Sequence, residues 1–214
     1  MTRCLQKSRL HMEDETFNSN CRYCNKKKED IFHILASCEY LSASLYLPVR
    51  HDEVGRVLYN ALIRKDNPSE EYVLPSQEVW LSNNIEIWWD TPVKTTPMVK
   101  HNRPDIVLWK KDVNKCFIID VCIPLDENVK TKEKTKLDRY VALSVGLNRI
   151  YPTYSYSVIL IVLGATGLIS NSLVKYVNEL GFEKKEVRSL ITNMQTKALI
   201  GSMRIMKSAM LMKS

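Results

Sequence analysis

Two β-forming segments separated by a short polar turn place the strongest constraint on how this chain can fold. Residues 105–109 and 116–123 are rich in β-branched and aromatic side chains. Pro104 precedes the first segment and Pro124 follows the second. A turn centred on residues 112–113 would join them as an antiparallel hairpin. The sequence therefore predicts a two-stranded core element around which the rest of the chain must pack.

The segments on either side of this hairpin alternate between helical and strand-like patterns. A pattern of this order is typical of an α/β domain rather than an all-helical one. Residues 70–80 are ambiguous, and we expect an irregular stretch with a short helix there. In the helix at 131–148, the 3.6-residue period runs through Leu137, Val141, Ser144, Val145 and Asn148. The further predicted elements are a helix with its apolar face on Val54, Val57, Leu58, Ala61 and Leu62, strands at 84–93 and 156–163, a helix at 172–180 with Gly181 at its C-cap, and a basic helix at 186–213.

Four metal-ligating side chains near the N-terminus have a regular spacing. Cys21 and Cys24 are separated by two residues, His33 follows after eight more, and Cys38 after a further four. This spacing allows one tetrahedral zinc ion to be enclosed. We expect Asp30 to cap a short helix that carries His33 and Cys38. Chance spacing is the alternative, but zinc is the better interpretation.

Composition restricts the class of protein and its compartment. The chain has 214 residues, 45% hydrophobic and 26% charged, which excludes a disordered tail or a disulfide-stapled miniprotein. The N-terminus lacks the apolar run of a signal peptide, and the apolar stretch 158–169 is too short to cross a membrane. We therefore expect an intracellular protein that is not secreted. Its net charge of +7 favours a polyanionic partner, with Lys184, Lys185, Arg188, Lys197, Arg204 and Lys207 in the basic C-terminal segment.

The hairpin also brings two carboxylates together. In the predicted register Asp105 lies opposite Asp120, and directly opposed side chains have Cβ atoms roughly 5 Å apart. Two such charges repel, raise one pKa or share a cation, and Mg²⁺ prefers carboxylate oxygens. Lys136, Arg139 and Tyr140 occupy neighbouring helical positions that could face this pair. The alternatives are that Asp105 only starts a strand, that Asp120 pairs with a lysine, and that the basic helix face is merely solvated.

Several stretches, taken in order, resemble a known family. Arg103-Pro104-Asp105 followed by Asp120-Val121 reads as the R/K-P-D-x(12–14)-D/E signature of the PD-(D/E)xK nucleases. The chain is similar, over about residues 20–210, to the C-terminal region of non-LTR retrotransposon polyproteins, where a Cys-Cys-His-Cys zinc knuckle precedes a restriction-like endonuclease. Further matching stretches are Arg50-His51-Asp52-Glu53-Val54, His101-Asn102-Arg103-Pro104-Asp105-Ile106, Ile118-Ile119-Asp120-Val121, Val162-Leu163-Gly164-Ala165-Thr166-Gly167, and Met194-Gln195-Thr196-Lys197-Ala198-Leu199-Ile200-Gly201 with Arg204-Ile205.

This resemblance implies a restriction-endonuclease-like mixed sheet flanked by helices and preceded by a small zinc knuckle. The implied layout is a loose lead-in at 1–20, the knuckle at 21–46 and the endonuclease domain at 47–214. The implied activity is Mg²⁺-dependent nicking of a DNA target to prime reverse transcription, in the nucleus, with the element's RNA as a further partner and neither a membrane nor a small-molecule substrate. The implied roles are catalysis and Mg²⁺ binding by Asp105 and Asp120, catalysis by Lys136, strand contact or positioning by Arg103, Arg139 and Tyr140, and structural zinc binding by Cys21, Cys24, His33 and Cys38.

The chain departs from the family in two respects. Position 122, where the motif usually has its lysine, is Cys122. In related nucleases this lysine has moved to the following helix, and Lys136 with Tyr140 matches that arrangement, with Lys134 as the rival. This sequence also does not include the polymerase that normally precedes the knuckle, so we expect a fragment, a truncated copy or a co-opted remnant. The competing interpretation is therefore a catalytically inactive, truncated or co-opted copy that acts as a zinc-containing nucleic-acid-binding module.

Overall fold

A mixed five-stranded sheet forms the centre of the computed structural model, which describes residues 19–75 and 79–211. The strands lie in chain order across the sheet. Neighbours are antiparallel from β1 to β4, whereas β4 and β5 run parallel and are joined through helix α5. This confirms an α/β fold. The strands are β1 (Trp80–Leu81), β2 (Ile85–Trp89), β3 (Ile106–Lys110), β4 (Lys115–Cys122) and β5 (Ser155–Val162).

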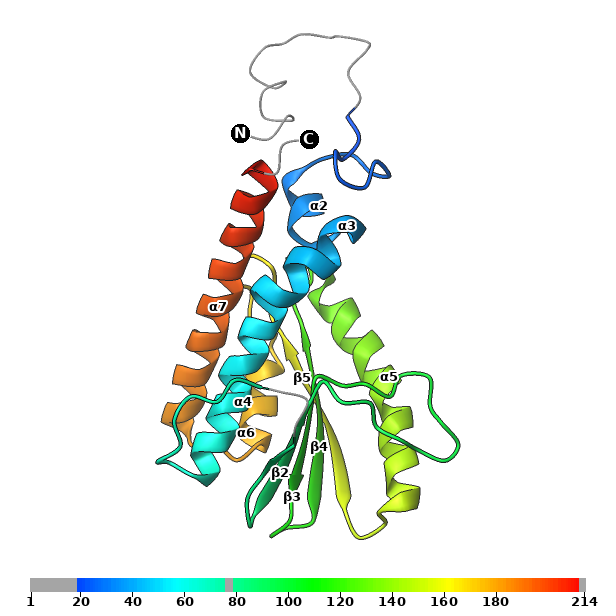
Figure 1. The fold of residues 1–214 in the computed structure, drawn as a ribbon, viewed down its shortest axis with the longest axis vertical. Coiled ribbons are helices and arrows are strands. Elements are labelled where there is room, and N and C mark those ends of the chain that lie inside the picture. Colours follow the sequence, from blue (N-terminus) through cyan, green and yellow to red (C-terminus); the bar gives the residue numbers. More distant parts are fainter. Residues whose placement is uncertain (1–18, 76–78, 212–214) are drawn as a thin grey trace.

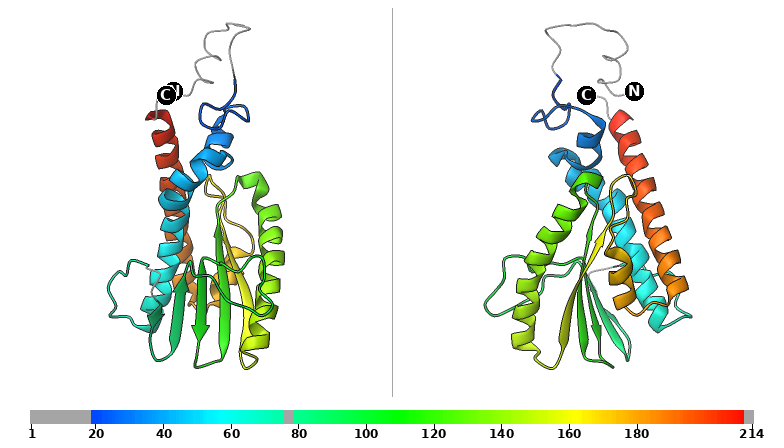
Figure 2. Two further views of the ribbon diagram at one scale, coloured as in Figure 1. Left: turned by 45° about the vertical axis from the view of Figure 1, so that its right-hand side comes forward. Right: turned by 180° about the vertical axis from the view of Figure 1, so that it is seen from behind.

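Helices cover both faces of the sheet (Figures 1 and 2). α4, α6 and α7 pack on one face, and α5 lies on the other. A continuous helical path, formed by η1 and α4, leads from the N-terminal region down along the sheet. The helical elements are α2 (Ile31–Ala36), α3 (Glu39–Leu41), the π-helix η1 (Ser42–His51), α4 (Asp52–Asp66), η2 (Asp126–Asn128), α5 (Val129–Ile150), α6 (Leu173–Glu179) and α7 (Lys184–Leu211).

Alternation along the strands divides the core into two layers, because successive side chains point to opposite faces. Ile106 and Leu108 of β3 belong to the layer under α4 and α7. Val107 and Trp109 belong to the layer under α5. Asp105 continues the second alternation. The face covered by α5 is therefore where the predicted carboxylates lie.

Helix α5 forms as predicted, but the predicted inner face is wrong. Val141 and Val145 are 47% and 51% exposed, whereas Tyr140, Leu143 and Leu147 are buried against the sheet. Tyr140, Leu143 and Leu147 are themselves spaced at i, i+3 and i+7, so a second face of the helix also fits the period, and this face packs on the sheet, where Tyr140 has a polar partner. The expected short helix between residues 70 and 80 is not found in the part of that stretch which the structure describes.

The N-terminal region is joined to the rest of the protein by a buried arginine at the end of η1. Arg50 is 2% exposed, and its Nη1 donates to the Leu35 carbonyl oxygen at 2.9 Å and to Ser202 Oγ at 3.0 Å. Its Nη2 lies 3.4 Å from the Ile123 carbonyl oxygen, just beyond β4. Gly201 of α7 has no side chain at this contact, where a Cβ would lie 2.6 Å from Arg50 Cβ.

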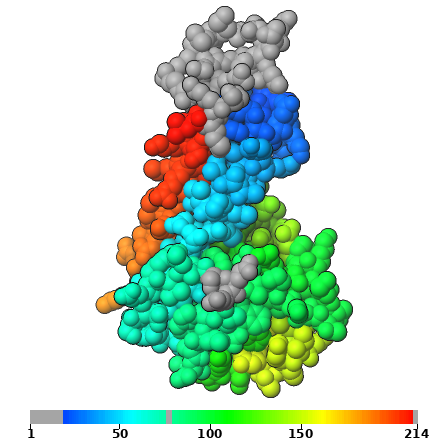
Figure 3. All heavy atoms as spheres, viewed as in Figure 1, coloured from blue at the N-terminus to red at the C-terminus, as the bar shows by residue number. Residues whose placement is uncertain are grey.

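The C-terminal end of α7 lies beside the N-terminal region (Figure 3). The Tyr23 hydroxyl donates to the carbonyl oxygen of Ala209, and Ala209 packs in the same apolar cluster as Ile34 and Leu41. The predicted boundary between residues 46 and 47 falls within η1, so the chain is continuously helical across it. Among the described residues, no helix combines the length and apolar character needed to cross a membrane.

Candidate metal centre and carboxylate site

The four predicted zinc ligands converge in the structure. One ligand atom from each of Cys21, Cys24, His33 and Cys38 lies within 4.8 Å of all the others. Asp30 caps α2 as predicted, because its side chain accepts the His33 backbone N–H at 2.7 Å. The prediction that Cys38 shares this helix is wrong. α2 ends at Ala36, and Cys38 instead precedes α3 as its N-cap residue.

Two of the distances between these atoms are close to those of a tetrahedral site. Cys21 Sγ lies 3.8 Å from Cys38 Sγ, and Cys24 Sγ lies 3.3 Å from His33 Nε2. Zinc–sulfur bonds of about 2.3 Å and zinc–nitrogen bonds of about 2.0 Å place two tetrahedral sulfur ligands roughly 3.8 Å apart and a sulfur and a nitrogen ligand roughly 3.5 Å apart. Cys21, His33 and Cys38 are buried, and Cys24 is half-buried. The cluster could therefore hold a metal ion such as zinc.

The predicted hairpin is confirmed residue by residue. Ile106 pairs with Ile119, and Lys110 pairs with Lys115 on either side of the turn. One step further along this register, Asp105 lies opposite Asp120. The Asp105 side chain bonds to β4 itself, since its Oδ2 accepts the Val121 backbone N–H at 2.6 Å.

Asp120 is the most enclosed carboxylate of this site. It is 2% exposed, and its Oδ1 accepts from Lys136 Nζ at 3.0 Å and from the Tyr140 hydroxyl at 2.7 Å. Lys136 and Tyr140 are one turn apart on α5 and so reach the same side of the sheet. The structure thus brings together Asp120, Lys136 and Tyr140, which the sequence analysis had selected.

The charges of this cluster affect one another. Burial, together with the negative charge of Asp105, raises the pKa of the Asp120 carboxyl, although Lys136 and Tyr140 oppose that shift. Burial disfavours the charge on Lys136, but the facing Asp120 carboxylate outweighs it and raises the pKa of the ammonium. Burial and the Asp120 charge also raise the pKa of the Tyr140 hydroxyl. Lys136 therefore stays a cation and Tyr140 a hydrogen-bond donor at neutral pH.

The second oxygen of Asp120 faces the same cation. Its Oδ2 is buried and lies 2.9 Å from Lys136 Nζ in an ion pair, although it accepts no hydrogen bond of good geometry. Two carboxylates on adjacent strands are a hard-oxygen donor set that suits Mg²⁺. The residues present therefore fit a divalent cation.

The other predicted residues lie at varying distances from this cluster. The Arg103 guanidinium is paired with Asp90 at 2.7 Å, while the Arg103 carbonyl oxygen lies 3.2 Å from the Tyr140 hydroxyl. Arg139 and Lys134 are exposed on α5. Cys122 shares the Asp120 side of β4; burial raises the pKa of its thiol, and the Lys136 charge opposes that rise.

His51 belongs to this site but was not selected from the sequence. Its Nε2 lies 3.2 Å from Asp105 Oδ2 and 3.1 Å from the Val121 carbonyl oxygen, and its Nδ1 lies 3.0 Å from Asp52 Oδ1. Burial lowers the pKa of this imidazole, but Asp105 and Asp52 outweigh burial and raise it to about 10. The stretch Arg50-His51-Asp52-Glu53-Val54 carried the family resemblance, yet nothing in its local pattern indicated contact with a strand so distant in sequence.

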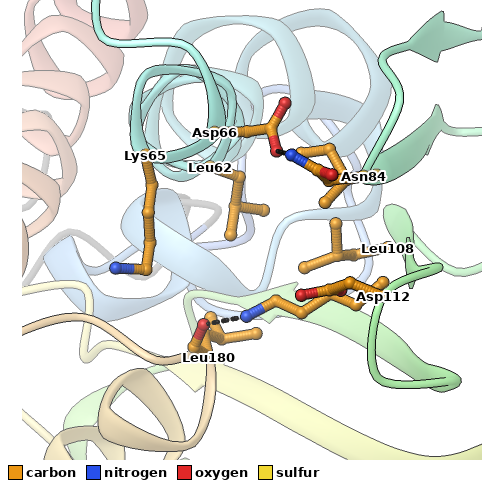
Figure 4. A pocket seen from close by; sticks show the side chains of 9 residues that line it. Leu62, Lys65, Asp66, Asn84, Leu108, Asp112 and Leu180 are labelled. Atoms are coloured by element: carbon orange, nitrogen blue, oxygen red, sulfur yellow. Dashed lines mark hydrogen bonds between the residues drawn. The ribbon is translucent and has the colours of Figure 1, made fainter.

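A separate cavity lies at the opposite end of β3 (Figure 4). It measures about 150 Å³ and is flanked by Lys65, Asp66 and Lys110. Lys110 Nζ donates to the Leu180 carbonyl oxygen at 2.7 Å. Five strand residues at about 3.3 Å each put it roughly 17 Å from Asp105. It contains none of the predicted site residues and does not belong to the carboxylate site.

No protein-family model matches the chain, and no curated protein matches it in sequence. The family resemblance therefore rests on the motifs of the sequence itself.

Proposed function

We propose that the chain is a divalent-metal-dependent DNA endonuclease domain of the non-LTR retrotransposon kind, with a restriction-endonuclease-like fold. The observation that carries this proposal is the contact of the buried Asp120 with Lys136 and Tyr140, on the sheet face that also carries Asp105. A purely structural aspartate gains nothing from a second carboxylate on the adjacent strand, because the two charges repel. A phosphodiester-cleaving site, in contrast, uses carboxylates and a cation together.

Each side chain has a chemical task in this proposal. Asp105 and Asp120 would hold Mg²⁺, which when bound supplies a Lewis acid for the scissile phosphate and favours ionisation of water. The Lys136 ammonium has three N–H donors and directs some of them at Asp120, so others can orient the attacking water or stabilise charge on the phosphate. Tyr140 fixes Asp120 through its hydroxyl. Arg103 and Arg139 would contact or position the strand.

The charge on the surrounding surface supports a nucleic-acid partner. Exposed basic side chains lie along the first half of α5, the helix that contacts Asp120, and a second series lies along α7. We propose that Cys21, Cys24, His33 and Cys38 bind zinc. The zinc would stabilise the N-terminal region, which contacts the C-terminal end of α7. A DNA target places the protein in the nucleus. The basic side chains are Lys130, Lys132, Lys134 and Arg139 on α5, and Lys184, Lys185, Arg188, Lys197, Arg204 and Lys207 on α7.

Nicking of supercoiled plasmid tests the proposal. The wild-type chain should convert it to the open circle with Mg²⁺ and not with EDTA. Asp120→Asn should lower the rate at least about 100-fold, a loss expected when a site group that acts on the transition state is removed. Its DNA affinity, measured by fluorescence anisotropy, should change little. Asp112→Asn, the same substitution at the exposed hairpin turn, is the matched control and should nick normally.

The binding-module alternative gives a different result in the same experiment. A chain that grips DNA without cutting would bind in the anisotropy assay but leave the plasmid supercoiled under all metal conditions. Equal nicking by the wild type and Asp120→Asn would point to a contaminating nuclease and would also contradict the proposal.

A further inference from the structure

His51 lies at the junction of three elements and contacts all of them through one ring. It is the last residue of η1, and its side chain is only 20% exposed. Nε2 faces both the Asp105 carboxylate before β3 and the Val121 carbonyl oxygen in β4. Nδ1 faces Asp52 at the start of α4. An imidazole with a carboxylate on each side can use both ring nitrogens as donors.

The Asp105 carboxylate is held through a single oxygen. Oδ2 accepts the Val121 backbone N–H at 2.6 Å and faces His51 Nε2 at 3.2 Å. Both of these contacts are made by Oδ2, and neither involves Oδ1. The Val121 N–H hydrogen bond from β4 and the ion-pair contact with the His51 ring from η1, whose Nε2 also faces the Val121 carbonyl oxygen at 3.1 Å, both converge on Oδ2 and limit rotation of the carboxylate. Oδ1 is thereby kept in one orientation, on the side of the sheet that also carries Asp120.

The element that carries His51 is itself fixed by the preceding residue. Arg50 bonds to Leu35, Ser202 and the carbonyl of Ile123, only two residues beyond Val121. The end of η1 is therefore attached to the end of β4 through two consecutive side chains. The position of the His51 ring relative to Asp105 is therefore fixed by the packing of η1 against its neighbours, and not by a loop that could move independently.

We propose that His51 is a positioning residue that orients the Asp105 carboxylate for a divalent cation. The inference rests on the proposed function and extends it, because the family resemblance assigned no role to His51. Partners that orient a metal ligand commonly change metal affinity or activity 10- to 100-fold when removed. The role requires an N–H donor at the Nε2 position and does not require a positive charge there.

Three variants of the full chain test this role. His51→Ala removes the donor, His51→Gln keeps an uncharged N–H near the Nε2 position, and His101→Ala changes an exposed histidine as the control. Mg²⁺ affinity is measured by isothermal titration calorimetry and nicking by plasmid assay, with circular dichroism to confirm folding. His51→Ala should weaken Mg²⁺ binding about 10- to 100-fold and slow nicking similarly. His51→Gln should recover most of both, and His101→Ala should match the wild type.

The possible results separate this inference from the proposed function. Wild-type Mg²⁺ affinity in His51→Ala would overturn the positioning role even if the plasmid is nicked. Tighter Mg²⁺ binding would overturn it too, since His51 would then be a cation that competes with the metal. A loss in His51→Gln as large as that in His51→Ala would contradict a role for the donor. Mg²⁺ binding that depends on His51, without any nicking by the wild type, would support positioning and reject the nuclease.

Discussion

The Cys/His cluster and the carboxylate site are built in opposite ways. The ligands of the first come from one continuous stretch, residues 21–38, and the short helix α2 is enough to place His33. The second draws on η1, β3, β4 and α5, which meet only when the sheet has formed. A cluster of local origin can be recognised from spacing alone. A site assembled from distant elements depends on register and packing, which spacing describes only in part.

The two sites also differ in how their polar groups are satisfied. The thiols and the imidazole of the first cluster lie against one another, with Cys21 facing Cys38 and Cys24 facing His33. Asp120 and Asp105 instead have cationic partners within the protein, Lys136 and His51. We infer that the Cys/His cluster depends on a metal for its structure, whereas the carboxylate site folds without one. This difference can be tested from both sides.

Loss of one thiol ligand should have the largest effect. Cys38→Ser removes a buried ligand, and structural zinc contributes roughly 10 kcal/mol or more of binding free energy in small modules. Elemental analysis should show one zinc per wild-type chain and a strong reduction in the variant. Limited proteolysis should then cut within residues 19–46, while the sheet stays protected.

The matched control is Cys116→Ala, a buried cysteine in β4 outside the cluster. It should keep one zinc per chain. A Cys38→Ser chain with undiminished zinc, or a wild-type chain purified without zinc and equally resistant to protease, would break the proposed contrast between the two sites.

Gly201→Ala should have an intermediate effect, because it acts where the two regions join. A Cβ there would lie 2.6 Å from Arg50 Cβ and 2.8 Å from Arg50 Cα. Relieving such overpacking costs about 1–3 kcal/mol, which exceeds the helix propensity gained by replacing glycine with alanine. Chemical denaturation should show the loss in the free energy of unfolding. Ser189→Ala on an exposed position of the same helix should be neutral or slightly stabilising, and equal stability of both variants would contradict this packing.

The smallest expected effect is a change in the salt dependence of DNA binding, which tests which region of the protein contacts the DNA backbone. Lys130→Gln/Lys132→Gln removes two exposed lysines from α5, the helix that also carries Lys136, and Lys27→Gln/Lys28→Gln removes two from the Cys/His region. Each lost phosphate contact lowers the slope of log affinity against log salt by about 0.9. Anisotropy titrations at several salt concentrations should show a reduction of about 2 for the α5 pair. A larger reduction for the pair at 27 and 28 would place the DNA elsewhere.

Much of the site could be predicted because the pattern that encodes it is local or geometric. The hairpin register followed from a turn placed between two β-forming segments, and it put Asp105 opposite Asp120. The helical spacing of Lys136 and Tyr140 predicted that both reach one side of α5, and both contact Asp120. The zinc ligands followed from their spacing, and Asp30 from the preference of aspartate for helix N-caps.

The remainder depends on contacts that no local pattern contains. His51 reaches Asp105 and Val121 only because η1 and α4 lie along the sheet. The buried face of α5 was misassigned because two faces of this helix fit a helical period, and the sheet packs on the one with Tyr140, Leu143 and Leu147, while Val141 and Val145 remain exposed. Polar pairing across the fold decides the position of His51, and packing against the sheet decides that of α5.

The central claim is that Lys136, held by Asp120, is the catalytic lysine. Lys134 is the direct comparison, since helical positions two apart do not face each other and Lys134 is exposed. The decisive measurement is the rate of Mg²⁺-dependent plasmid nicking at saturating DNA, with the unfolding temperature of each variant recorded alongside. Lys136→Ala should slow nicking at least about 100-fold, and Lys134→Ala should leave it near the wild-type rate. An essential Lys134 with a dispensable Lys136, or a folded Lys136→Ala chain that nicks normally, would contradict the account.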